Sequence, residues 1–248
     1  MGRKFELVLF DLGSTLIYFD GVFPEIMAQA DLRLFQELVG LGYHLDPHDF
    51  IPTFRTSLQA YFHQRDVDFI EHTVETVLRN TLVGAGYPNI PPEHIHAALR
   101  QMYAVTQSGW KREEDALPTL AELSRQGYRL GLVSNAADAE DVRSMLQQHQ
   151  LANWLELVLI SAEVGYRKPH PYIFQQALSF FAVSPERAVM VGDKLGADIM
   201  GAQNAGLASV WITRRAHRTD NWAHEDTIRP DASIETLAEL PALLEGWQ

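Results

Sequence analysis

The sequence predicts an α/β protein: a Rossmann-like, doubly wound parallel sheet with a helical cap domain inserted into it. Short apolar segments recur along the chain, each ending in small or polar residues, and amphipathic helical patterns separate the later ones. Residues 21–110 differ, because they show long helical periodicity with little strand character. We therefore predict a core domain of residues 1–20 and 111–248, interrupted by a cap domain of residues 21–110.

Five segments are predicted strands because they are nearly apolar throughout, which is typical of parallel strands covered by helices on both faces. They are residues 5–10, 128–133, 155–160, 188–191 and 208–212. Amphipathic spacing predicts core helices at residues 117–126, 139–149, 172–181 and 197–205. The polar segment 214–231 is a predicted surface loop, followed by a last short strand and a helix over residues 234–244.

Within the insert, residues 26–41 and 69–83 are predicted helices. Prolines are expected where helices begin or end, because proline lacks the backbone N–H that continues a helix. These prolines are Pro47, Pro52, Pro88, Pro91 and Pro92. A helical domain that enters directly after the first strand would lie over the carboxyl ends of the strands, where open α/β sheets bind ligands.

The composition indicates a soluble cytoplasmic protein. Twenty basic against 32 acidic residues give a net charge of −12, which should repel nucleic acid and anionic membranes. The chain has no cysteine, which excludes disulfides and thiolate chemistry and suits a reducing compartment. The apolar N-terminal segment meets Asp11 too soon for a signal peptide, and no apolar run approaches the ~20 residues that cross a bilayer. An anionic substrate would need a local positive site.

Chemically active side chains follow four of the predicted strands. A carboxylate, a hydroxyl, an amine and a second pair of carboxylates would meet at one edge of the sheet. The segments are Asp11-Leu12-Gly13-Ser14-Thr15, Ser134-Asn135, Arg167-Lys168-Pro169-His170-Pro171 and Gly192-Asp193-Lys194-Leu195-Gly196-Ala197-Asp198. Each segment alone is more simply a helix cap or a turn. The four together, in this order and each after a strand, indicate a catalytic site.

In order and spacing these motifs resemble those of the haloacid dehalogenase-like hydrolase superfamily, and the insert resembles its helical C1 cap by position. The resemblance implies a phosphatase in which Asp11 attacks phosphorus and forms an aspartyl-phosphate. It also implies a Mg²⁺ ion held by Asp11, Asp193 and the backbone carbonyl of Gly13. A small phosphorylated metabolite would be the substrate.

The resemblance assigns supporting roles to the remaining motif residues. Lys168 would neutralise the phosphoryl oxygens and keep Asp11 ionised. Ser134 and Asn135 would bind the phosphoryl group with neighbouring backbone N–H groups. Thr15 would orient the first loop, and Asp198 would orient Lys168 or a metal-bound water.

The chain departs from the superfamily at Gly13, where its phosphatases carry an aspartate that serves as general acid and base. Such a group is typically worth about 10²–10⁴-fold in rate. The substrate could need little protonation, as an acyl phosphate or phosphoanhydride does, or Asp20 could supply the proton. A 2-haloacid dehalogenase is a second alternative, because a halide leaves without a general acid. Asp193 argues against it, because the dehalogenases of the superfamily lack the metal and do not keep this acidic residue. A protein that binds phospholigands with little turnover is the other alternative.

Two further groups are candidate site residues. The pair His94 and His96 diverges on a helix, so a metal site there is disfavoured. Aromatic residues of the cap region could line a substrate pocket, but we favour a role in the core. They are Phe19, Phe23, Tyr61, Phe62 and Trp110.

Overall fold

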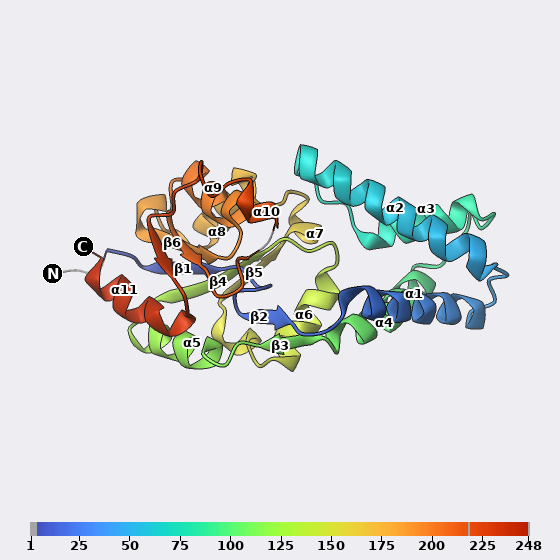
Figure 1. Cartoon of the computed structure of the whole chain (residues 1–248), viewed down its shortest axis with the longest axis horizontal. Coiled ribbons are helices and arrows are strands. Elements are labelled where there is room, and N and C mark those ends of the chain that lie inside the picture. Colours follow the sequence, from blue (N-terminus) through green and yellow to red (C-terminus); the bar gives the residue numbers. More distant parts are fainter. Residues whose placement is uncertain (1–3, 218, 248) are drawn as a thin grey trace.

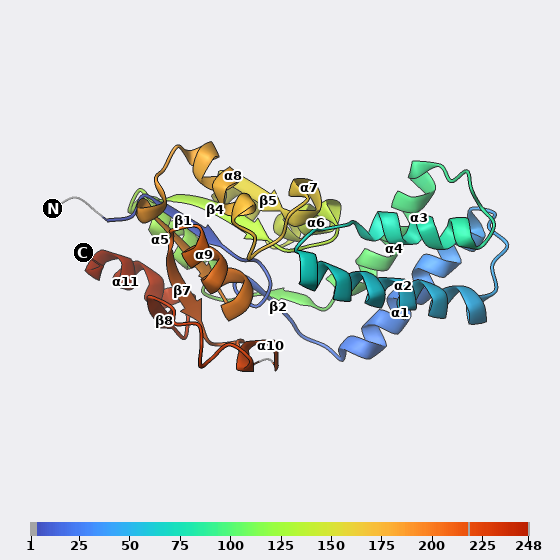
Figure 2. The same cartoon turned by 90° about the horizontal axis from the view of Figure 1, so that it is seen from above.

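The computed structural model describes residues 4–217 and 219–247 of the chain. The molecule is elongated, with an α/β core at the end that holds both termini and a helical cap at the other end (Figures 1 and 2). Among the described residues, no helix has both the length and the apolar character that a membrane span requires.

The core contains a six-stranded parallel sheet with the strand order β5-β4-β1-β6-β7-β8. The strands are β1 (Leu7–Phe10), β4 (Arg129–Ser134), β5 (Leu157–Ile160), β6 (Ala188–Gly192), β7 (Ala208–Ile212) and β8 (Ala232–Ile234). The doubly wound parallel sheet predicted from the sequence is confirmed. Because β1 lies at the centre, the loop that follows it emerges between the loops that follow β4 and β6.

Alternate residues of β1 pack on opposite faces of the sheet. Val8 and Phe10 join an apolar cluster with α5 (Ala116–Arg125), α6 (Ala139–Gln148) and α11 (Leu240–Gly246). Leu7 and Leu9 join a second cluster with α8 (Pro171–Phe181) and α9 (Met200–Asn204). Figure 1 shows these two helical layers on either side of the strands. Burial on both faces explains why the strands are apolar throughout.

The cap consists of α1 (Phe23–Gly40), α2 (Pro47–Asp68), α3 (Val74–Gly84) and α4 (Pro92–Gln107). They share an apolar core of their own, which includes Leu34, Phe54, Leu78 and Leu99. An antiparallel ribbon of β2 (Ile17–Phe19) and β3 (Trp110–Arg112) carries the chain into the cap and back. The helical insert is confirmed, while the sequence did not predict this ribbon.

Two details of the cap differ from the sequence-based expectation. Pro52 lies inside α2 rather than at a helix boundary, because the helix already begins at Pro47 behind the capping side chain of Asp46. The helix predicted over residues 69–83 begins only at Val74, since Thr73 caps it and Phe69 has a left-handed backbone.

Short helical turns complete the core. They are η1 (Ala152–Trp154), α7 (Ser161–Val164), η2 (Pro185–Arg187), η3 (Leu195–Ile199), α10 (Thr219–Trp222) and η4 (Leu237–Glu239). The predicted helix 197–205 is thus a π-helical turn followed by α9. The predicted loop 214–231 contains α10, and residue 218 of that loop lies outside the described residues.

Candidate active site

Lys168 connects the loop after β1, the end of β4 and the loop after β6. Its Nζ lies 2.6 Å from Asp11 Oδ1, 2.6 Å from the carbonyl oxygen of Val133 and 2.7 Å from Asp198 Oδ1. The lysine side chain is almost completely buried. Burial alone would lower the pKa of Lys168, but the two carboxylates outweigh burial and raise this pKa above its ordinary value. The amine is therefore a fixed positive charge against Asp11.

Three carboxylates form an acidic cluster around this amine. Oxygen atoms of Asp11, Asp193 and Asp198 all lie within 4.8 Å of one another. Three carboxylates and one ammonium leave a formal charge of −2 in a mostly buried site, which suits one divalent cation. The hard oxygen donors suit Mg²⁺. Both oxygens of Asp198 already have partners, because Oδ1 contacts Lys168 Nζ at 2.7 Å and Oδ2 accepts the backbone N–H of Lys194 at 2.9 Å. Asp11 and Asp193 would therefore hold the ion.

The loop after β6 is shaped to place these two acidic residues. The backbone carbonyl of Asp193 accepts hydrogen bonds from Trp211 Nε1 and from Asn221 Nδ2, both at 2.9 Å. A Cβ atom at Gly192 would lie 2.3 Å from the carboxyl group of Asp198. Only glycine therefore allows the Asp198 side chain to cross the strand end toward Lys168.

The predicted phosphate-binding residues Ser134 and Asn135 line a cavity beside this acidic cluster, and Asn135 has a supporting role. Its side-chain carbonyl oxygen accepts the backbone N–H of Lys168, and its side-chain NH₂ group donates to the backbone carbonyl of Lys168, each at 2.8 Å. Both ends of the Asn135 amide therefore hold the lysine backbone. Ser134 is buried at the end of β4 and lines the cleft. Thr15 is fully buried in the first loop, and its hydroxyl has no hydrogen-bond partner among the described residues.

Gly13 faces an aromatic ring rather than a polar group. A Cβ atom at this position would meet the indole of Trp110 at 3.4 Å. The Trp110 ring packs edge-on against Phe19 at a centroid distance of 5.5 Å. The indole therefore occupies the space into which a longer side chain at position 13 would extend.

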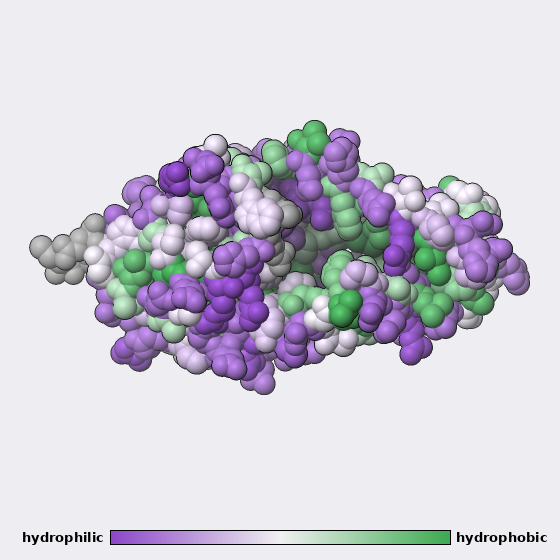
Figure 3. All heavy atoms as spheres, viewed as in Figure 1, coloured by the Kyte–Doolittle hydropathy of each residue, from purple (hydrophilic) through white to green (hydrophobic). Residues whose placement is uncertain are grey.

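Core and cap enclose a cavity of about 500 Å³ above the acidic cluster. Figure 3 shows that this face of the molecule is hollowed between the core and the cap. The cap contributes Arg65, Asp66 and Phe69 to the wall of this cavity. The core contributes Asp11, Ser134, Asn135, Lys168 and Asp198, together with Arg167, Lys194 and His224. Trp110 from the ribbon completes the wall. We call this cavity the catalytic cleft.

A family described as "Haloacid dehalogenase-like hydrolase" matches residues 48–212, about two thirds of the chain. This chain is a haloacid dehalogenase-like hydrolase. A glyceraldehyde 3-phosphate phosphatase from Pyrococcus furiosus is 37% identical to this hydrolase, over 98% of this chain and 93% of the relative. The match to a phosphatase along the whole length confirms the predicted enzyme class.

Solved structures agree with this assignment. A 2-haloacid dehalogenase from Pseudomonas syringae superposes with a TM-score of 0.69 and 25% identity, over 98% of this hydrolase and all of that chain. A phosphatase of the same superfamily from Thermococcus onnurineus superposes with a TM-score of 0.64 and 26% identity, over 97% and 98% of the two chains. Both reactions thus occur on this fold, and the side chains of the cleft must distinguish them.

Several cleft residues of the hydrolase were not predicted from the sequence. Trp110 is half-buried, packs against the apolar core and also lines the cleft. Of the other aromatic candidates Tyr61 is buried, whereas Phe23 and Phe62 are 58% and 38% exposed. Arg65 and Arg167 carried no motif signal that pointed to the site, although Arg167 directly precedes Lys168.

Two other candidates lie away from the chemistry. Asp20 is half exposed, forms an ion pair with Lys111 and does not line the cleft. This lysine lowers the pKa of Asp20, which makes the carboxyl a poorer proton donor. His94 contacts the hydroxyl of Tyr43 and His96 contacts Glu75, so the two rings serve different partners.

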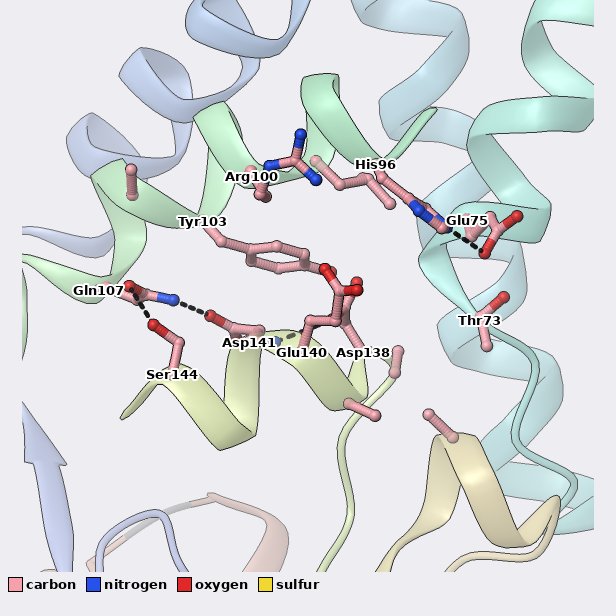
Figure 4. A pocket seen from close by; sticks show the side chains of 15 residues that line it. Thr73, Glu75, His96, Arg100, Tyr103, Gln107, Asp138, Glu140, Asp141 and Ser144 are labelled. Carbon is pink, nitrogen blue, oxygen red and sulfur yellow. Dashed lines mark hydrogen bonds and ion pairs between the residues drawn. The ribbon is translucent and has the colours of Figure 1, made fainter. Parts of the chain in front are cut away.

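A second pocket of about 460 Å³ lies between α4 of the cap and α6 of the core (Figure 4). Gln107 Nε2 donates to Asp141 Oδ1 at 2.8 Å across this boundary. Figure 4 shows the Tyr103 hydroxyl directed toward the carboxyl groups of Asp138 and Glu140. Burial raises the pKa of Asp141 to about 6. This pocket lacks the motif residues, so we assign the chemistry to the catalytic cleft.

Proposed function

We propose that this hydrolase is a Mg²⁺-dependent phosphatase that acts on a small phosphorylated metabolite through an aspartyl-phosphate on Asp11. The observation that supports the proposal most strongly is the position of Asp11, whose carboxylate contacts the Lys168 amine at 2.6 Å and has an oxygen within 4.8 Å of a carboxylate oxygen of Asp193. A lone carboxylate would repel a phosphate group. Here the fixed ammonium, together with a cation shared with Asp193, would allow the two anions to approach each other.

In the proposed reaction an oxygen of Asp11 attacks phosphorus, and the bond to the leaving oxygen breaks. Lys168 stabilises the charge on the phosphoryl oxygens, and Ser134 donates a hydrogen bond to them. Asn135 and Asp198 hold Lys168 in place, and Thr15 orients the first loop. The bound Mg²⁺ would supply Lewis-acid stabilisation of the transferring group. Water then hydrolyses the aspartyl-phosphate, which restores Asp11 and releases inorganic phosphate.

The cleft offers no carboxylate at position 13, so the leaving group must depart without a proton from that position. The proposal therefore favours substrates whose leaving oxygen is a weak base, such as phosphoanhydrides and acyl phosphates. Among alkyl esters, glyceraldehyde 3-phosphate is the first to examine, because it is the substrate in the name of the Pyrococcus furiosus relative.

The test is a panel of phosphorylated metabolites assayed with and without Mg²⁺ on the wild type, Asp11→Asn and Asp193→Asn. We expect hydrolysis that requires Mg²⁺ and falls by at least about 10³-fold in Asp11→Asn, since the nucleophile is lost. Asp49→Asn is the matched control, because Asp49 is exposed on α2 and does not line the cleft. Phosphate binding without turnover would contradict the proposal and favour a binding protein. Metal-independent chloride release from 2-chloropropionate would favour a dehalogenase.

A further inference from the structure

One buried carboxylate, Glu71, binds groups from both the cap and the core. Its Oε1 accepts a hydrogen bond from the Tyr61 hydroxyl and another from Arg65 Nη1 at 3.2 Å. Its Oε2 accepts from Ser161 Oγ at 2.7 Å and lies 3.5 Å from Arg167 Nη1. The Glu71 side chain is fully buried. A buried carboxylate with this many partners is a fixed structural element.

The segment around Glu71 joins the cap to the loop that carries Lys168. The Glu71 N–H donates to the carbonyl of Gly165, and the Arg167 N–H donates to the carbonyl of Phe69, both at 3.0 Å. Arg167 therefore extends from the residue next to Lys168 toward the cap. Arg167 and Lys168 both line the catalytic cleft.

Arg65 and Arg167 carry one more positive charge than Glu71 neutralises. Asp66 Oδ1 lies 3.8 Å from Arg167 Nη2, but its side chain is 68% exposed, so water screens this contact. Burial and the neighbouring charge of Arg65 lower the pKa of Arg167, as expected for cations held close together. Glu71 contacts one nitrogen of each guanidinium group, Nη1 of Arg65 and Nη1 of Arg167.

A positive site in this cleft is unexpected for a chain with a net charge of −12. Both arginines line the same cavity as Asp11 and Lys168. Lys168 already serves the reacting end of the cleft through Asp11. The two guanidinium groups are therefore placed for the part of the substrate that does not react, where their forked N–H donors suit a carboxylate or phosphate.

We infer that Arg65 and Arg167 form a subsite for a negatively charged leaving group, and that the preferred substrate is a small phosphoanhydride. The inference rests on the proposed function and specifies its substrate class. It combines the cationic pair with the missing acid at Gly13. When Asp11 attacks one phosphorus of pyrophosphate, the electron pair of the broken P–O bond goes to the bridging oxygen. That oxygen leaves as part of a phosphate ion, which needs no proton from the enzyme and pairs with the arginines.

Four substrates separate the charge of the leaving group from its basicity. Inorganic pyrophosphate has a weakly basic, charged leaving group, and acetyl phosphate has a weakly basic group with an uncharged tail. 3-Phosphoglycerate and glyceraldehyde 3-phosphate are both alkyl esters. The leaving group of the first carries a carboxylate, and that of the second carries an uncharged aldehyde. At constant free Mg²⁺ we expect kcat/KM to be highest for pyrophosphate, and about 10- to 100-fold higher for 3-phosphoglycerate than for glyceraldehyde 3-phosphate.

Variants then test the arginines directly. Arg65→Gln and Arg167→Gln should each lower the ratio of kcat/KM for pyrophosphate to that for acetyl phosphate by about tenfold, mainly through KM. Arg167→Lys should restore part of the ratio, because it keeps the charge without the forked donors. Arg143→Gln is the matched control, since Arg143 pairs with Glu163 on the surface outside the cleft, and its ratio should equal that of the wild type.

A measurement on the wild type covers the case in which the glutamine variants do not fold. Phosphonoacetate should inhibit acetyl phosphate hydrolysis with a Ki at least about tenfold below that of propylphosphonate, which has a similar shape and no carboxylate. Equal inhibition, or unchanged ratios in folded arginine variants, would overturn the subsite. If Mg²⁺-dependent turnover of acetyl phosphate requires Asp11 but no preference for charged leaving groups is found, only this inference fails. If no substrate is turned over, the proposed function fails.

Discussion

Introducing an aspartate at position 13 should give this hydrolase the proton donor that its sequence lacks. A positioned general acid is worth about 10²–10⁴-fold, which corresponds to about 3–5 kcal/mol of activation free energy. The gain should appear only where the leaving oxygen is a strong base. We therefore expect Gly13→Asp to raise kcat/KM for glyceraldehyde 3-phosphate and to change that for acetyl phosphate little.

The structure limits how much of this gain the single variant can reach. The new Cβ would contact the indole of Trp110 at 3.4 Å, which is an ordinary contact, but a carboxyl group that extends from it toward the indole would have to displace the ring. Forcing extra atoms into a packed site costs about 1–3 kcal/mol. The single variant should therefore gain only about tenfold on the alkyl ester. Gly13→Asp combined with Trp110→Ala removes the obstacle and should gain about 10²-fold or more relative to Trp110→Ala alone.

The assay is a leaving-group series of phosphate monoesters that runs from aryl to alkyl, with kcat/KM plotted against the pKa of the leaving alcohol. For the wild type we expect a steep decline toward alkyl esters, and for the double variant a shallow one. Trp110→Ala alone is the control for the loss of the indole, and it should keep the steep decline. Equal slopes in all three proteins would refute this explanation of Gly13.

Two predictions concern the boundary between cap and core. Burial raises the pKa of Asp141 to about 6 from its ordinary 3.8. Between about pH 4 and 6 the unfolded chain loses this proton more easily than the native state does, so the free energy of unfolding falls as the pH rises, by about 3 kcal/mol at most. Because the residue lies in the first turn of α6, the helix dipole offsets up to about 1 kcal/mol. Asp141→Asn, which can still accept from Gln107, should stabilise the protein by about 2 kcal/mol at pH 8 and by clearly less at pH 4.5, measured by urea unfolding. An equal effect at both pH values would contradict this reasoning. Glu71→Ala removes the shared acceptor of Arg65 and Arg167 and should destabilise the protein by about 3 kcal/mol, whereas a change under 1 kcal/mol would show that the Glu71 contacts contribute little.

The core and the catalytic loops could be predicted because each has a local signal. The predicted strands at residues 188–191 and 208–212 agree with β6 and β7 to within one residue, since continuous apolar runs end abruptly at glycine or polar residues. Parallel strands bring their carboxyl ends to one edge, so the approach of Asp11, Lys168 and Asp193 followed from topology alone.

The cap side of the cleft could not be predicted, because its contacts join residues that are distant in sequence. The ribbon strand Trp110–Arg112 is too short and too polar for a periodic pattern, and nothing near Gly13 in the sequence indicates that Trp110 covers it. In the sequence, Glu71 and Arg167 resemble ordinary charged residues of a protein surface. Their burial depends on how the α2–α3 segment packs against the core, which no spacing encodes.

The central claim is that Asp11 attacks phosphorus with the help of Lys168 and a divalent cation shared with Asp193. Mass spectrometry of enzyme that is acid-quenched during turnover of acetyl phosphate tests this claim most directly. We predict a single added phosphoryl group on Asp11, dependent on Mg²⁺ and absent in Asp11→Asn. Normal Mg²⁺-dependent turnover by Asp11→Asn, or a phosphoryl group trapped on another residue, would contradict it.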